Sequence, residues 1–131
     1  MSRRKDSGYF NTEPVKVGNV PIADYTINYE VHGAGPIRIA LIMGFMASFG
    51  SWMQVVNHFA KNSKYSVLVL DNRGVGYSSN GSLARYTTYG LAEDFITVLK
   101  HIEWTQDKSV HLFGCSMGGM IAMEAALQLP E

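Results

Sequence analysis

The chain has 131 residues, 47% of them hydrophobic and 17% charged, and its 11 Lys and Arg balance its 11 Asp and Glu. This composition is typical of a folded globular domain and excludes a disordered chain. Because the net charge is zero, nothing in the composition indicates a nucleic acid or an anionic membrane as partner, and we expect neither.

The cysteine content and the apolar runs bear on location. Cys115 is the only cysteine, which excludes an internal disulfide and a Cys-based metal site and favours a reducing compartment. The longest apolar run, which begins at Ile39, is far too short to span a bilayer. A polar stretch, and not an apolar leader core, follows the basic start. We therefore expect a cytoplasmic protein without a transmembrane segment.

The first part of the chain predicts a β-hairpin. Residues 1–14 are polar and expected to be loose, ahead of a folded region over residues 15–131. The stretch "VKVGNVPIADYTINYEVHGAG" suggests two strands, with clear alternation from Tyr25 to Val31. The "HGAGP" sequence then predicts a turn, which makes His32 a turn residue.

Three strand–helix units follow the hairpin. The runs "IRIALIMG" and "YSVLVLD" are continuous and apolar, as strands buried on both faces of a parallel sheet are, and "SVHLFG" is a third short apolar strand. The helices predicted after them are "SWMQVVNHFAKN" with Ser51 as its cap, the amphipathic "TTYGLAEDFITVLKHIEW", and "SMGGMIAMEAALQL", which Pro130 ends. The last helix is apolar nearly all round, so we expect it to be buried centrally.

The predicted order β-β-β-α-β-α-β-α indicates an α/β fold whose mostly parallel sheet carries an antiparallel N-terminal hairpin. In such sheets ligands bind outside the C-terminal ends of the strands. The loops that we expect to meet there are "MGFMASFG", "DNRGVGYSS" and "GCSMGG".

Residues 114–118 read G-x-S-x-G between an apolar strand and an apolar helix. This pattern can mount Ser116 on a strained strand-to-helix turn, where glycine at both flanking positions avoids clashes. The N–H of Met117 would lie at a helix N-terminus, where donors are unpaired. A serine nucleophile needs such donors for the oxyanion and a base for its proton. A tight turn with a capping serine and no chemistry is the alternative, and the context favours the nucleophile.

Three stretches in order, "LIMGFMASFGSW", "LDNRGVGYSS" and "LFGCSMGGMIA", resemble the motifs of the α/β-hydrolase family. They correspond to the oxyanion loop after strand 3, the D-x-R-G-x-G-x-S turn after strand 4 and the nucleophile elbow after strand 5. The resemblance runs from about Val15 to the end of the chain. It implies the N-terminal part of an α/β-hydrolase domain over residues 15–131.

The resemblance implies roles for individual residues. Ser116 matches the nucleophile, while Met117 and Phe45 match the backbone N–H donors of the oxyanion hole. Gly44, Met43 and Phe49 are expected at the substrate site. The residues matched to the structural part of the motifs are Gly114, Gly118, Gly119, Asp71, Arg73, Gly74, Gly76 and Ser78.

The sequence departs from the family pattern at two of these places. Met43 stands where a His usually precedes the glycine of the oxyanion loop, and Cys115 replaces a common His before the nucleophile. Neither position normally breaks bonds, so the resemblance implies altered pocket shape and not lost chemistry. A thiol function of Cys115 is a weaker alternative, because no activating neighbour is evident in the sequence.

In this family the acid and the His of the triad follow the serine along the chain. We expect none of His32, His58, His101 and His111 to act as the base, and we expect Asp71, Glu93 and Asp94 to support loops or helices. The chain is therefore predicted to be a truncated serine hydrolase, inactive by itself, for an ester, thioester or related acyl bond of a small molecule.

A non-catalytic binding module of hydrolase-like fold is the alternative function. The apolar strand over residues 109–113 would be an open sheet edge, which invites association with another chain. The resemblance implies no cofactor, and no metal-ligand cluster is visible in the sequence.

Overall fold

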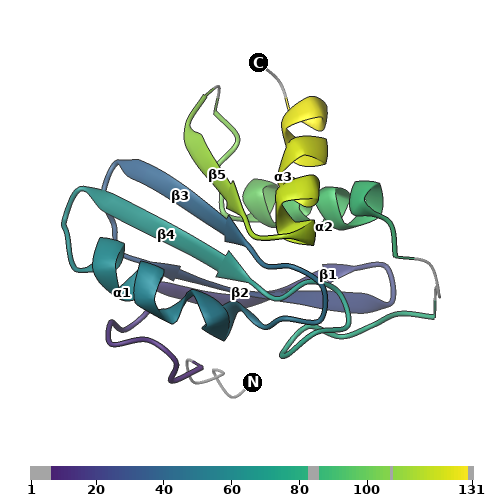
Figure 1. The fold of residues 1–131 in the computed structure, drawn as a ribbon, viewed down its shortest axis with the longest axis horizontal. Coiled ribbons are helices and arrows are strands. Elements are labelled where there is room, and N and C mark those ends of the chain that lie inside the picture. Colours follow the sequence, from purple (N-terminus) through teal and green to yellow (C-terminus); the bar gives the residue numbers. More distant parts are fainter. Residues whose placement is uncertain (1–6, 83–85, 107, 130–131) are drawn as a thin grey trace.

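A computed structural model describes residues 7–82, 86–106 and 108–129 of the chain. This part of the chain forms a mixed sheet of five strands with three α-helices (Figure 1). The elements are β1 (Lys16–Ile22), β2 (Tyr25–His32), β3 (Ile37–Ile42), the 3-10 helix η1 (Phe49–Trp52), α1 (Met53–Ala60), β4 (Tyr65–Leu70), α2 (Thr88–His101), β5 (Val110–Gly114) and α3 (Met117–Gln128). The predicted α/β class and order of elements are confirmed, with η1 added before α1.

The strands lie in the order β1-β2-β4-β3-β5. β1 pairs with β2, and β2 with β4, in antiparallel register, whereas β3 pairs in parallel with both β4 and β5. The N-terminal hairpin therefore extends a parallel core of three strands, as predicted. Because β3, β4 and β5 run in the same direction, their C-terminal ends meet at one edge of the sheet.

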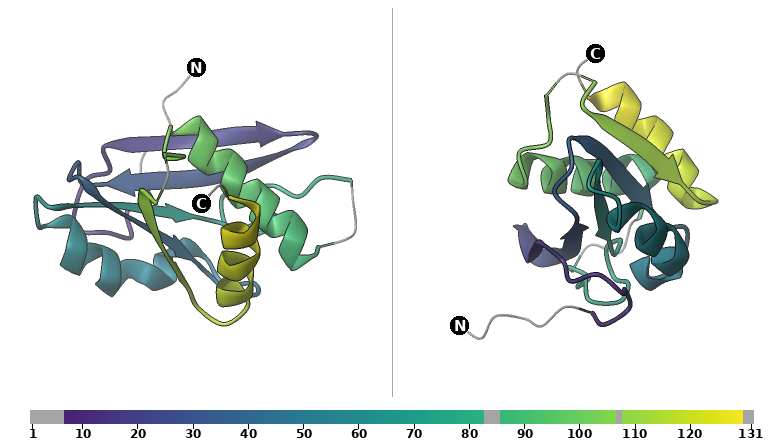
Figure 2. Two further views of the ribbon diagram at one scale, coloured as in Figure 1. Left: turned by 90° about the horizontal axis from the view of Figure 1, so that it is seen from above. Right: turned by 90° about the vertical axis from the view of Figure 1, so that its left-hand side faces the viewer.

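The sheet separates two hydrophobic cores, and strand β3 contributes to both. On β3, Ile39 and Leu41 face the core under α1, while Ala40 and Ile42 face the core under α2 and α3. Figure 2 shows α1 on one side of the sheet and α2 with α3 on the other. Alternate residues of a strand point to opposite faces, so a strand buried on both faces must be apolar throughout. The "IRIALIMG" run follows from this requirement.

The helix starts differ in one place from the sequence expectation. Thr87 caps α2 by accepting a hydrogen bond from the Gly90 N–H at 2.9 Å. The cap of the preceding helical region is Ser48, which accepts from the Gly50 N–H, and not Ser51. The helical region therefore starts three residues earlier than predicted, because the 3-10 helix η1 precedes α1.

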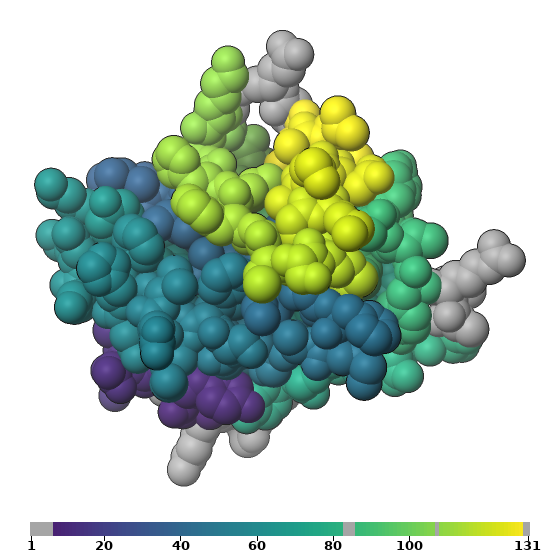
Figure 3. Space-filling model, in the orientation of Figure 1, coloured from purple at the N-terminus to yellow at the C-terminus, as the bar shows by residue number. Residues whose placement is uncertain are grey.

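The prediction that α3 is buried centrally is wrong. Gly118, Ile121 and Ala125 are buried, but Met120, Met123 and Leu127 are exposed. The helix packs against α2, β5 and β3, and among the described residues no element lies over its other face. Figure 3 shows α3 at the surface beside β5.

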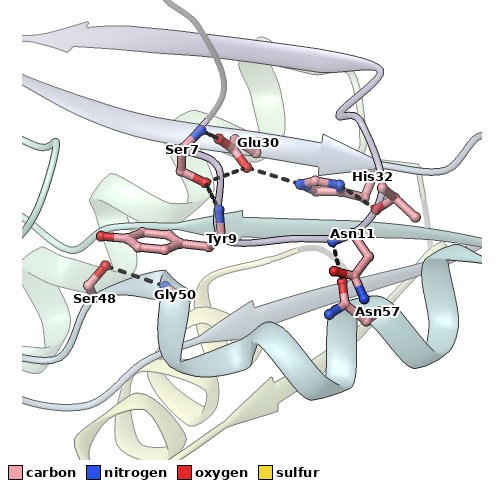
Figure 4. Close-up of polar contacts among 9 residues, drawn as sticks. Ser7, Tyr9, Asn11, Glu30, His32, Ser48, Gly50 and Asn57 are labelled. Atoms are coloured by element: carbon pink, nitrogen blue, oxygen red, sulfur yellow. Dashed lines mark hydrogen bonds and ion pairs between the residues drawn. The ribbon is translucent and has the colours of Figure 1, made fainter.

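The described part of the N-terminal segment is packed and not loose, contrary to the expectation for residues 1–14. The Ser7 N–H and hydroxyl both donate to the carboxylate of Glu30, at 2.6 and 3.2 Å (Figure 4). Phe10 packs against Phe49 and His32, with ring centroids 5.9 and 4.6 Å apart. The prediction relied on the polar composition of the segment, which does not show the few specific contacts that hold it in place. Residues 1–6 of that prediction lie outside the described part.

The prediction that His32 is a turn residue is wrong. His32 is the last residue of β2 and is fully buried. Its Nε2 lies 3.0 Å from the Glu30 carboxylate, and its Nδ1 lies 2.9 Å from the Thr12 hydroxyl. The N-terminal segment supplies the polar partners that allow β2 to bury two ionisable side chains.

Candidate functional site

Ser116 lies on the turn between β5 and α3, with φ 56° and ψ −122°. Non-glycine residues rarely adopt such angles, which cost about 1–3 kcal/mol and persist only where the surrounding structure enforces them. Ser116 occupies the N-cap position of α3, yet its side chain accepts no capping hydrogen bond, and the residue is exposed. The hydroxyl is therefore not used to cap the helix, which removes the structural explanation for a serine here.

Two glycines make this turn sterically feasible. A Cβ on Gly114 would overlap the backbone of Gly118 and Gly119, and a Cβ on Gly118 would overlap the Ile42 carbonyl. The turn is closed by hydrogen bonds from the Gly118 N–H to the Cys115 carbonyl and from the Gly119 N–H to the Ser116 carbonyl, at 2.8 and 2.9 Å. Gly119 differs from the other two glycines, because a Cβ there would meet its nearest neighbour at an ordinary 3.5 Å.

The loop after β3 lies directly against this turn. The Cys115 N–H donates to the Ile42 carbonyl at 3.1 Å. A Cβ on Gly44 would lie 2.9 Å from the Cys115 carbonyl oxygen, 3.3 Å from the Ser116 Cβ and 3.6 Å from the Met117 nitrogen. Parallel pairing of β3 with β5 causes this proximity, since it places the ends of both strands side by side.

The two amides that the sequence singled out lie on these two segments. Among the described residues, neither the Phe45 N–H nor the Met117 N–H donates a backbone hydrogen bond. Phe45 is 74% exposed. Met117 is the first residue of α3, where an N–H has no partner within the helix.

Asp71 holds the turn after β4 together, as expected from the sequence. Its buried carboxylate accepts from the Phe49 N–H at 2.7 Å and from the Tyr77 N–H at 2.9 Å. A Cβ on Gly76 would overlap that carboxylate, which explains the glycine. The Ser78 hydroxyl donates to the Asp71 carbonyl at 2.6 Å, so the motif residues on this turn act as a structural unit.

Arg73 is neutralised by α2 and is not a free cation. Its Nη2 lies 2.9 Å from Oδ2 of Asp94, and its guanidinium stacks on the rings of Tyr25 and Tyr86. The Tyr25 hydroxyl donates to Asp94 at 2.6 Å. Burial, together with the Asp94 carboxylate, raises the pKa of Tyr25 to about 12. Asp94 thus supports the turn, as the sequence predicted.

A cleft of about 340 Å³ opens beside these segments. It is lined by the loop after β3, the turn after β4, the start of α2 and Met117. Of the predicted site residues, the cleft brings together Gly44, Phe45, Arg73, Gly74 and Met117. The lining residues that the sequence did not single out are Met46, Asn72, Val75, Tyr86, Thr87, Thr88 and Leu91. Met46, Asn72 and Val75 lie within the quoted motifs and the other four lie outside them, but only the fold reveals that all of them line one cleft.

Two predicted substrate-site residues lie elsewhere. Phe49 is fully buried in the core under α1, against Tyr9 and Phe10, so its prediction as a substrate-binding residue is wrong. An aromatic side chain near a glycine-rich loop suits a pocket and a core equally well, and here η1 turns it inward. Met43 does not line the cleft, but its carbonyl accepts a hydrogen bond from Asn72.

The histidines lie apart from the serine. His32 is engaged with Glu30 and Thr12. His101 packs on Tyr29, His58 packs on Phe59, and His111 is exposed on β5. Over residues 7–82, 86–106 and 108–129, no hydrogen bond joins the Ser116 hydroxyl to a histidine.

The described part of the chain lacks a metal-ligand cluster and a membrane-spanning helix. It contains no group of three His, Cys, Asp or Glu side chains placed to hold a metal ion. No helix in it has the length and hydrophobicity needed to cross a bilayer.

Comparison with known proteins gives a consistent result. The sequence model of the family with the alpha/beta hydrolase fold matches residues 38–131. The uncharacterized hydrolase YugF of Bacillus subtilis (strain 168) is 35% identical over 117 residues, which are 85% of this chain and 41% of that protein. The pimeloyl-[acyl-carrier protein] methyl ester esterase of Aeromonas hydrophila is 30% identical over 106 residues, 81% of this chain and 38% of the esterase.

A solved structure shares the fold. A membrane phospholipase A, described as a bacterial virulence factor, superposes with a TM-score of 0.73 at 30% identity, over 85% of this chain and 34% of the phospholipase. The chain thus spans well under half the length of these relatives.

Proposed function

The chain belongs to the alpha/beta hydrolase fold family, and on that premise we propose that it carries the nucleophile and oxyanion hole of a serine hydrolase. Ser116 attacks the carbonyl carbon of an ester, thioester or related acyl bond of a small molecule, the alcohol or thiol leaves, and water hydrolyses the acyl-enzyme. The observation that carries this proposal is the conformation of Ser116, exposed at φ 56° and ψ −122° at the start of α3. Such a turn keeps the hydroxyl accessible at the end of the sheet.

The neighbouring amides support the same chemistry. A tetrahedral intermediate puts negative charge on the former carbonyl oxygen, and preorganised N–H donors stabilise it. The Phe45 and Met117 amides lie on the two segments that touch at Gly44, and the cleft beside them is lined by both residues. One relative is an ester hydrolase by name, which agrees with an acyl substrate.

A general base is the part that the described residues do not provide. We propose that the base and its acid partner come from further along the family's domain, as the triad order of the family implies. Without a base, a serine triad retains only a residual acceleration of about 10³–10⁴-fold over water, from binding and the oxyanion hole. We therefore expect the 131-residue chain by itself to turn over substrate at no more than that rate.

Labelling with a fluorophosphonate probe tests the nucleophile. The probe forms a covalent bond to an activated serine. A protein that contains this chain together with the base and acid of the triad, called the triad-complete protein below, should therefore be labelled, and its Ser116→Ala variant should not. Ser63→Ala, which removes an exposed serine on the turn before β4, serves as the matched control and should be labelled normally. Folded Ser116→Ala protein that is labelled as strongly as the wild type would contradict the assignment, as would a folded wild-type protein that is not labelled at all.

A further inference from the structure

The loop that carries the Phe45 amide has little hydrogen bonding of its own. Between Met43 and Ser48 the described backbone shows one internal hydrogen bond, from the Ala47 N–H to the Gly44 carbonyl at 3.4 Å, which is long. Met46 has a positive φ of 55° and is 76% exposed. The position of this loop must therefore be set by groups outside it.

Two consecutive residues at the end of β4 hold the loop at its two ends. The Asn72 Nδ2 donates to the Met43 carbonyl at 2.8 Å. The Asp71 carboxylate accepts from the Phe49 N–H at 2.7 Å. Both side chains are almost fully buried, so these hydrogen bonds are protected from water. Parallel pairing of β4 with β3 places them beside the loop.

The bond from Asn72 acts at a sensitive point. The residue after Met43 is Gly44, where an added Cβ would lie 2.9 Å from the Cys115 carbonyl oxygen and 3.3 Å from the Ser116 Cβ, so this glycine lies close to the serine turn. On its other side, the Met43 carbonyl lies close to Gly118, where a Cβ would approach it to 2.9 Å. A rotation of the Met43–Gly44 peptide would therefore move the loop relative to the serine.

We propose that Asn72 is a positioning residue of the active site, whose amide fixes the Met43 carbonyl and thereby places the Phe45 N–H of the oxyanion hole beside Ser116. This inference rests on the proposed function. Asn72 itself touches no reacting atom. Donors to an oxyanion are effective because they are held in place before charge develops. A misplacement of about 1 Å can cost on the order of 10²-fold in rate.

Two substitutions remove the hydrogen bond from Asn72 to the Met43 carbonyl, and a third serves as their matched control. Asn72→Ala deletes the donor, and the nearly isosteric Asn72→Asp replaces it with a carboxylate that cannot donate to the Met43 carbonyl. Asn28→Ala is the control, because Asn28 is also buried and donates to a backbone carbonyl, that of Gly18, at 2.9 Å. Asn28 lies on β2 and does not line the cleft. Its side chain bonds to β1, whereas only its backbone bonds to Asp71 and Ser78, and Asn28→Ala keeps that backbone.

Kinetics separate positioning from mere stabilisation. In the triad-complete protein with p-nitrophenyl acetate as substrate, both Asn72 variants should lower kcat by about 10–100-fold and leave KM within about 3-fold. The inhibition constant of an alkylboronic acid, which forms a tetrahedral adduct with an activated serine, should rise in parallel with the fall in kcat. A smaller folded fraction would lower the apparent kcat but would not change the inhibition constant. Asn28→Ala should change neither quantity.

A second readout needs no activity. In ¹⁵N-labelled protein, the amide resonances of Gly44 and Phe45 should shift in Asn72→Ala and Asn72→Asp and stay in place in Asn28→Ala. Unchanged resonances, or an unchanged kcat and boronate inhibition in folded Asn72 variants, would overturn the role of Asn72. A wild-type protein with no Ser116-dependent turnover would instead overturn the proposed function and with it the catalytic part of this inference, whereas the resonances still test the hold on the loop.

Discussion

At the turn that carries Ser116, glycine is required at two positions by contact with neighbouring backbone. Gly114 and Gly118 have no room for a Cβ, whereas Gly119 has. All three glycines look equivalent in the sequence "GCSMGG" and were assigned to the same motif. The distinction arises from two close approaches of backbone: the Ile42 carbonyl of β3 leaves no room for a Cβ on Gly118, and the backbone of Gly118 and Gly119 leaves none for a Cβ on Gly114.

A matched pair of alanine substitutions tests this distinction. Gly118→Ala should lower the free energy of unfolding by about 1–3 kcal/mol, because its Cβ would force the helix away from the Ile42 carbonyl. Gly119→Ala should be neutral or stabilising by up to about 1 kcal/mol, since alanine favours a helix more than glycine does. Urea unfolding measures both values, and equal effects of the two substitutions would contradict the packing described at the turn.

At the scale of elements, β5 and α3 together expose a group of apolar side chains. Within the described part of the chain, β5 is the terminal strand of the sheet and pairs only with β3. Phe113 on β5 is 53% exposed, and α3 presents Met120, Met123 and Leu127 beside it. A strand edge with apolar side chains is a template for pairing with another chain. Association through residues 109–113 stays a prediction from the sequence.

Sedimentation velocity over a range of concentrations tests that association. The 131-residue chain is expected to self-associate, and Phe113→Lys should weaken the association by about 10-fold or more, because a charge on an edge strand opposes pairing. Tyr89→Lys is the control, since Tyr89 is equally exposed at 53% but lies on α2. An equal effect of both substitutions would indicate non-specific hydrophobic contact, and a monomeric wild type would refute the prediction.

At the scale of the whole molecule, the N-terminal segment joins the hairpin to the α1 side of the sheet. Ser7 is hydrogen-bonded to the buried Glu30, and Thr12 to the buried His32. The Asn11 N–H donates to the side chain of Asn57 on α1 (Figure 4). Burial alone would raise the pKa of the Glu30 carboxyl. The hydrogen bonds from His32 and Ser7 outweigh burial, so its pKa lies below the ordinary value of 4.5.

The stability of the fold should therefore depend on Glu30 in acid. A lowered folded pKa contributes stability above the unfolded pKa, and that stability is lost as the pH falls from about 4.5 through the folded pKa. Glu30→Gln should flatten the loss of unfolding free energy between about pH 5 and pH 3. Glu93→Gln, on the exposed face of α2, should leave the dependence of the unfolding free energy on pH as it is in the wild type. Denaturant unfolding across this pH range decides the point, and an unchanged slope in Glu30→Gln would contradict it.

Much of the fold and part of the site could be predicted from the sequence, because they follow from local periodicity and local sterics. A run such as "IALI" must be a doubly buried strand, and a serine flanked by glycines between strand and helix must turn sharply. Asp71 as a loop anchor was predicted for the same reason. The confirmed element order and the family itself belong to this class of inference.

Other features were decided only by the tertiary structure, since they depend on which distant groups meet. The order that places β3 between β4 and β5 brings Asn72 to the Met43 carbonyl and Gly44 to Ser116. Phe49 turns into the core and not to the cleft, and Tyr9 and Phe10 pack against it there. Local patterns record which residues avoid water and which bend the chain. They do not record which strand end lies next to which, and that proximity determines the geometry around the serine.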